Sequence, residues 1–340
     1  TIRAIPPIKK GMGMATRRTS KQSASKETLQ RLRDLALDPT EQATYAATLL
    51  DARNGAEVIL AVLQILTRAP HAPARVALWS LYDYYAGRGQ QQDAAAYLRS
   101  AIVRALREVV LPEDVPRLAK VAATYVFPPP QFKEEGSMLR SAALAALNEL
   151  DDDLGRYHAV RLLANEHTDP MSGEPALTAA KVLAMRGEVL PLYFYVMQDG
   201  ARTLPEVVSA CLGNLTSLRA DLLPDLLDRF RDSATDDPSE IVLVGLFDLL
   251  LNHEDGPQAL DFITTFLQTS DQLDAYRYLV VTMATSGKGE LVDLLMAQAG
   301  ATTSRNKAMI LCDALALLPQ PHRAVKQLIT ELQTVAAARR

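Results

Sequence analysis

Apolar and polar positions along the chain follow a helical period from about residue 26 onward. Segments of roughly 12 to 18 residues, rich in leucine and alanine, alternate with short breakers that contain glycine or proline. Between residues 137 and 150 the apolar side chains recur mostly at three- and four-residue steps, at Leu139, Ala143, Leu144, Leu147 and Leu150. No segment keeps the two-residue alternation of a β-strand. The pattern therefore predicts an all-α protein.

The predicted helices form pairs, and the pairs repeat. Six segments each contain a helix, a short turn and a second helix, in residues 140–164, 177–197, 207–230, 241–266, 275–297 and 307–332. Their turns recur at intervals of 30 to 35 residues, the length of one helical hairpin. A hairpin cannot bury both of its faces alone and must stack on neighbouring hairpins. Small residues such as Gly245 would let the helices of adjacent hairpins approach closely. We therefore expect a right-handed α-α superhelix, an α-solenoid of antiparallel helix pairs.

Two family resemblances accompany this pattern. By unit length and helical pairing, residues 136 to 335 resemble degenerate HEAT or armadillo-type repeats. Residues 77–102 resemble one tetratricopeptide repeat, because six positions fall near the Leu, Tyr, Gly, Ala, aromatic and Ala of that consensus: Leu81, Tyr85, Gly89, Ala94, Tyr97 and Ala101. Both resemblances imply a helical-repeat scaffold that binds proteins, peptides or sometimes nucleic acid.

Breakers and composition divide the chain into four parts. Residues 1–25 contain prolines, glycines and a Thr/Ser-rich stretch, so we predict a disordered arm, with the first helix starting near Ser25. Residues 26–126 form N-terminal helical repeats, and residues 137–340 form the HEAT-like repeats. Between them, residues 127–136 include three successive prolines that cannot continue a helix. This proline-rich loop either redirects the solenoid or joins two subdomains.

Charge is distributed unevenly between the arm and the rest of the chain. The net charge of −4 combines +8 in residues 1–33 with −12 in the remainder. The arm could contact RNA, DNA, an anionic membrane surface or an acidic protein patch. It could also be a targeting leader or a solvated tail. The residues predicted to contact an anionic partner are Arg3, Lys9, Lys10, Arg17, Arg18, Lys21 and Lys26.

Residues of the types that catalyse reactions or bind metals do not occur here at the spacings typical of catalytic or metal sites. The five histidines form no HExxH or comparable ligand pattern, and no glycine-rich phosphate loop is present. His158 follows three aspartates, which suggests acid–base chemistry, but acids at a helix start also complement its dipole and cap it. Cys211 and Cys312 lie in apolar segments without a CxxC, as expected of buried thiols in a reducing compartment. We expect no catalytic residue, metal or cofactor, and no enzymatic activity.

The length of the apolar runs indicates whether the chain crosses a membrane and where in the cell it is expected. The longest apolar run, residues 241–251, is broken by Asp248 and is shorter than the roughly 18 residues of a membrane span. The N-terminal residues lack the apolar core of a signal peptide. We therefore expect a cytoplasmic protein without a membrane span.

The function predicted from these features is a non-enzymatic scaffold that binds a protein or peptide on its repeat surface. The densest aromatic cluster, Tyr193, Phe194 and Tyr195, is either a contact for that partner or part of the core between repeats. An alternative is nucleic-acid association through the basic arm. A further alternative is a HEAT-like DNA glycosylase, although the single tryptophan, Trp79, and the acidic remainder of the chain oppose it.

Overall fold

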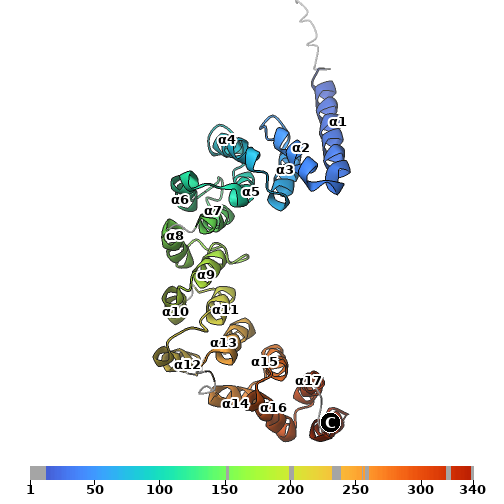
Figure 1. Cartoon of the computed structure of the whole chain (residues 1–340), viewed down its shortest axis with the longest axis vertical. Helices are drawn as coiled ribbons and strands as arrows, with labels where there is room; N and C mark the ends of the chain where they lie inside the picture. Colours follow the sequence, from blue (N-terminus) through green and yellow to red (C-terminus); the bar gives the residue numbers. More distant parts are fainter. Residues whose placement is uncertain are drawn as a thin grey trace, which may run out of the picture. The chain divides into compact units, whose positions relative to one another are not determined.

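The protein is all-α over the residues that its structure describes. The computed structural model describes residues 13–150, 153–198, 203–231, 239–254, 256, 260–318 and 323–337, with helices α1 to α18 and no strand among them (Figure 1). The chain divides into two compact units. Unit 1 is Thr1–Arg161 with His167–Asp169, and unit 2 is Leu162–Glu166 with Pro170–Arg340. None of the helices in the described part of the chain is long and apolar enough to cross a membrane.

The described residues of unit 1 form seven complete α-helices and most of an eighth. They are α1 (Gly13–Asp34), α2 (Pro39–Thr48), α3 (Ala56–Arg68), α4 (Arg75–Ala86), α5 (Tyr97–Leu106), α6 (Val115–Ala122), α7 (Ser137–Glu149) and, up to Arg161, α8 (Asp153–Leu163). Contacts run from α3 to α5 and from α5 to α7, while α4 packs on α5 and α6 packs on α7. The buried side chains at the centre are aliphatic, including Ile59, Leu63, Ile102, Leu106 and Leu118.

The first helix begins earlier than predicted. It starts at Gly13 rather than near Ser25, so residues 13–25 of the expected disordered arm are helical. The physical reason is composition: after Gly13 the stretch has neither proline nor a further glycine and is rich in residues of good helix propensity such as Met, Ala, Arg, Lys and Gln. Asp38 caps the start of α2, because its Oδ1 accepts the backbone N–H groups of Thr40 and Glu41.

The described residues of unit 2 form ten further α-helices. They are α9 (Ala176–Met185), α10 (Val189–Met197), α11 (Pro205–Gly213), α12 (Leu223–Arg231), α13 (Glu240–Asn252), α14 (Leu260–Thr269), α15 (Leu273–Thr285), α16 (Gly289–Ala301), α17 (Arg305–Leu315) and α18 (Arg323–Ala337). These helices match the five predicted pairs between residues 177 and 332. The first helices of the pairs, α9, α11, α13, α15 and α17, contact one another in succession. Gly245 allows the approach of α13 to α11, since a Cβ there would lie 2.4 Å from the Ser209 carbonyl oxygen.

Basic side chains recur at the carboxyl ends of helices in unit 2. Lys307 Nζ donates hydrogen bonds to the carbonyl oxygens of Leu267 (3.0 Å) and Gln268 (3.3 Å) at the end of α14. Arg229 Nη2 donates to the Gln198 carbonyl oxygen at the end of α10, at 2.6 Å. A cation at this end of a helix complements both the unpaired carbonyls and the helix dipole. The Arg229 contact ties one hairpin to the next, and the Lys307 contact joins α17 to α14, across the hairpin of α15 and α16.

Candidate functional site

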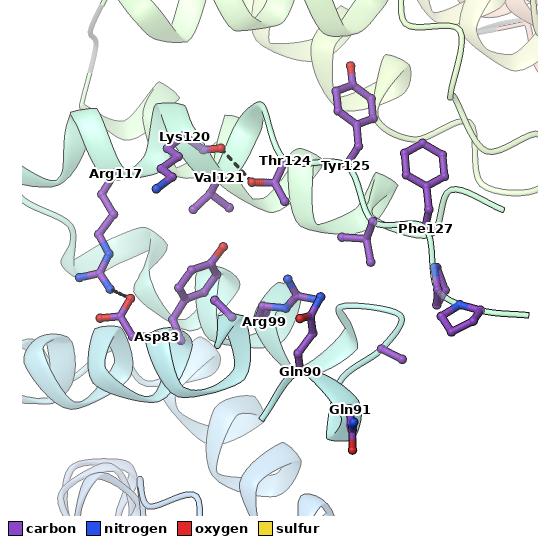
Figure 2. Close-up of a pocket in the computed structure, with 16 residues that line it drawn as sticks. Asp83, Gln90, Gln91, Arg99, Arg117, Lys120, Val121, Thr124, Tyr125 and Phe127 are labelled. Atoms are coloured by element: carbon purple, nitrogen blue, oxygen red, sulfur yellow. Dashed lines mark hydrogen bonds and ion pairs between the residues drawn. The ribbon is translucent and has the colours of Figure 1, made fainter. Parts of the chain in front are cut away.

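A groove in unit 1 is the site where polar and apolar side chains converge from several elements. It has a volume of about 730 Å³, within the range of ligand pockets. Figure 2 shows its two sides: α4 and the 3-10 turn Gln90–Gln92 form one, and α6 with the segment that follows it forms the other. Arg99, from α5, lies between them.

The floor of the groove consists of Tyr82 and Arg99, which are 7% and 4% exposed. Asp93 positions Arg99: its carboxylate accepts the backbone N–H groups of Leu98 and Arg99 at the start of α5 and the Arg99 Nε at 2.8 Å. The carboxylate therefore caps the helix and pairs with the guanidinium in one arrangement. Burial raises the pKa of Tyr82, although the nearby Arg99 and Arg117 act in the opposite direction.

Two cations of α6 lie one turn apart on the side of the groove. The Arg117 guanidinium forms an ion pair with Asp83 (Figure 2). It also donates to the Trp79 carbonyl oxygen at 3.2 Å and lies 4.0 Å from the centre of the Trp79 ring. Arg117 is thus held by three contacts to α4. Lys120 is exposed, and its ammonium has no hydrogen-bond or ion-pair partner among the described residues. Its charge is available to a ligand.

The remaining wall is the segment that leaves α6, residues 124–129. Three prolines from Pro128 to Pro130 lack backbone N–H groups and prevent a helix here, as the sequence predicts. Val126 and Pro128 supply apolar surface to the groove. The rings of Tyr125 and Phe127 point away from Arg99 and Gln90 (Figure 2), and both rings contact His167 edge to face.

A buried ion pair anchors this wall. Arg140 Nη1 and Nη2 donate to the two carboxylate oxygens of Glu134 at 2.6 and 2.9 Å, and the Arg140 guanidinium lies 4.4 Å from the centre of the Tyr125 ring. Glu134 Oε1 also accepts the backbone N–H groups of Val126 and Gly136. Both ends of the proline-rich loop are therefore fixed to α7 by one carboxylate.

The arrangement can bind a ligand that carries both acceptor groups and apolar surface. The groove offers hydroxyl, guanidinium, ammonium and carboxamide donors beside apolar surface. No group of three or more His, Cys, Asp or Glu side chains is close enough to hold a metal ion in the described part of the chain. Cys211 is buried, and burial raises its pKa to about 12, so its thiol is protonated at neutral pH.

The described lining of this groove includes none of the residues predicted to contact an anionic partner. Arg3, Lys9 and Lys10 fall outside the described residues. Arg17, Arg18 and Lys21 belong to α1, where the backbone alone is described, and Lys26 is an exposed residue of the same helix.

The predicted aromatic contact is divided between core and surface. Tyr195 is 5% exposed and its hydroxyl accepts the Leu204 backbone N–H at 3.4 Å, so it belongs to the core between α10 and α11. Tyr193 is half-buried, and Phe194 is 66% exposed. A partner could reach Phe194 and part of Tyr193, whereas Tyr195 is covered.

Sequence reasoning missed the groove residues for an identifiable reason. Tyr82, Arg99 and Lys120 come from three helices and share no spacing motif. The available signals were indirect: the tetratricopeptide-like stretch, which contains Tyr82 and Arg99, and the proline run that forms the opposite wall. Comparison with protein-family models, with curated proteins and with solved structures gave no match for this chain.

Proposed function

We propose that the chain is a non-enzymatic helical-repeat protein that binds a segment of a partner protein in the groove of unit 1. The observation that carries this proposal is the groove itself, in which two almost fully buried polar side chains, Tyr82 and Arg99, form the floor beneath an exposed cation, Lys120. The long segment between α6 and α7 supplies one wall of this groove, and stacked helical repeats use such surfaces for binding.

The finer fold assignment belongs to the same proposal. Successive contacts among the first helices of unit 2, with a hairpin repeat of 30 to 35 residues in the sequence, support a right-handed α-solenoid of HEAT-like repeats. The exposed Phe194 would add a contact on unit 2, and the basic arm would add an electrostatic one.

A groove-filling substitution tests the proposal. Random peptides of about ten residues, displayed on phage, are selected against the full chain, and the enriched peptides are measured by fluorescence anisotropy. Ala86 is exposed and lines the groove, so Ala86→Trp fills it, while Ala72→Trp places the same ring on an exposed turn of unit 1 outside the groove. The peptides should bind the wild type and the Ala72→Trp variant and lose binding to the Ala86→Trp variant. Failure to enrich any peptide, or equal binding to both variants, would count against the proposal.

Nucleic-acid association through the basic arm is a second candidate, favoured by the net charge of +8 in residues 1–33. It predicts that single-stranded DNA or RNA binds at low salt, that the affinity falls steeply as salt rises, and that replacing Arg17, Arg18 and Lys21 by Gln abolishes binding. Binding that is unaffected by the triple substitution would contradict this role for the arm.

A further inference from the structure

We propose that the groove selects partner segments by a carboxylate, so that the preferred ligand is an acidic peptide whose Asp or Glu side chain reaches Tyr82, Arg99 and Lys120. This inference rests on the proposed function, because it names the chemistry of the peptide that the groove binds. An apolar residue of the peptide would lie beside Val126 and Pro128.

Charge in the groove is the first argument. Two of its cations are already balanced, Arg117 by Asp83 and Arg99 by Asp93. Lys120 has no carboxylate partner among the described residues, so the lining keeps a net positive charge. An anionic group on the ligand supplies the missing partner, and a groove with low-dielectric walls strengthens that attraction.

Unused hydrogen-bond donors at the floor are the second argument, and they are independent of the first. The Tyr82 hydroxyl lines the groove and has no hydrogen-bond partner among the described residues, although the side chain is 7% exposed. Arg99 donates through Nε and Nη2 to Asp93, and its Nη1 makes no hydrogen bond to the described part of the chain. Both groups are hydrogen-bond donors on side chains that are mostly buried, and an oxygen acceptor on a ligand would satisfy them.

Shape favours a peptide carboxylate over the phosphates of a nucleic acid. Nucleic-acid backbones are bound by a series of cations along an open surface, because each phosphate contributes one charge. In this groove a single uncompensated cation lies beside apolar surface from Val121, Val126 and Pro128. One carboxylate flanked by apolar side chains matches that lining, and a bound side chain of this kind makes charge-assisted hydrogen bonds with Tyr82 and Arg99.

The test uses the full chain and positional-scanning peptide libraries of about ten residues in which one position is fixed as Asp, Glu, Asn, Gln or Lys. Binding is measured for the wild type and for the Lys120→Gln and Tyr82→Phe variants. Lys133→Gln is the matched control, because Lys133 is an exposed residue of the proline-rich loop that does not line the groove. Far-UV circular dichroism checks that each variant keeps its helices.

We expect libraries with fixed Asp or Glu to bind at least about tenfold more tightly than the matching Asn or Gln libraries. Lys120→Gln and Tyr82→Phe should each remove most of that preference, and Lys133→Gln should leave it unchanged. The preference should also shrink as salt is raised, because part of it is the attraction of Lys120 for an exposed charge.

Three outcomes would overturn the inference, and each is distinguishable from failure of the proposed function. If the acid and amide libraries bind equally and Ala86→Trp still weakens both, peptides bind in the groove but a carboxylate does not select them. An acid preference unaffected by Lys120→Gln and Tyr82→Phe would place the selecting charge elsewhere. Binding of a single-stranded DNA oligonucleotide that Ala86→Trp abolishes, without acidic-peptide binding, would assign the groove to nucleic acid. If no library binds the wild type, both proposals fail.

Discussion

The Arg140 guanidinium and the Glu134 carboxylate form a two-hydrogen-bond ion pair whose side chains are 0% and 5% exposed. The pair connects α7 to the proline-rich loop, and the same carboxylate holds the backbone of Val126 in the wall of the groove. Removing one member of a buried ion pair leaves the other charge uncompensated in a low-dielectric environment. This contact therefore links the stability of unit 1 to the shape of its binding site.

Substitution of Arg140 by Met should lower the free energy of unfolding of unit 1 by about 3 to 5 kcal/mol, because it strands the Glu134 charge. The measurement is urea denaturation followed by the fluorescence of Trp79, which is the single tryptophan of the chain and lies in unit 1. The double variant Glu134→Gln/Arg140→Met removes both charges and should be less destabilised than Arg140→Met alone. An effect of Arg140→Met below about 1 kcal/mol would contradict this account of the pair.

Acidification should destabilise unit 1 through His158. Burial, and secondarily the charge of Arg161, lower the pKa of His158, and Arg161 Nη2 lies 3.3 Å from its Nδ1. The folded state therefore binds this proton less readily than the unfolded state does. The contribution of His158 to stability is fully present above the unfolded pKa of about 6.5 and is lost as the pH falls through the lower folded value.

The pH effect is measured as a difference between two proteins. Urea denaturation is followed by Trp79 fluorescence between neutral pH and pH of about 5, for the wild type and for His158→Gln. The wild type should lose more stability than the variant on acidification, since the other titrating groups contribute to both. If the free energy of unfolding falls equally with pH in both proteins, His158 does not cause the loss of stability.

Gly245 should resist even the smallest enlargement. A Cβ at this position would lie 2.4 Å from the Ser209 carbonyl oxygen, which is backbone and cannot turn aside. Gly245→Ala must separate α11 from α13 and should cost about 1 to 3 kcal/mol or more. Gly289→Ala is the matched control, because a Cβ there meets nothing within 4 Å and alanine favours the first turn of α16.

Circular dichroism at the helical minimum, measured during urea denaturation, compares the two glycine variants. We expect Gly245→Ala to lower the urea midpoint clearly. Gly289→Ala should leave the free energy of unfolding unchanged or raise it by less than about 1 kcal/mol. Equal midpoints for the two variants would mean that α11 and α13 are not in close contact at Gly245.

The two thiols should differ in reactivity toward Ellman's reagent. Cys211 is fully buried, and burial raises its pKa to about 12, whereas Cys312 is half-buried. In the native protein Cys312 should react first and Cys211 slowly or not at all, and both should react at once in denaturant. The Cys312→Ser variant isolates Cys211, whose rapid labelling in the native state would contradict its burial.

Helix content and hairpin pairing could be predicted from the sequence, because they depend on residues close together in the chain. Three- and four-residue apolar spacing sets which face of a helix is buried, and breakers such as Gly187 and Gly287 end the helices where the period stops. Both glycines have positive φ, which a side chain would oppose. Residues 13–25 are helical although residues 16–25 are rich in Thr and Ser, because their Arg, Lys, Gln and Ala residues favour a helix.

The tertiary structure alone determined which side chains are buried and which side chains from different helices meet in one site. The same local pattern makes Tyr195 a core residue and Phe194 a surface residue, because α11 covers one face of α10. Tyr82, Arg99 and Lys120 line one groove, although the position of each within its own helix gives no sign of a binding site. Spacing within a helix determines the side of that helix on which a residue lies, and the packing of one helix on another determines what that side faces.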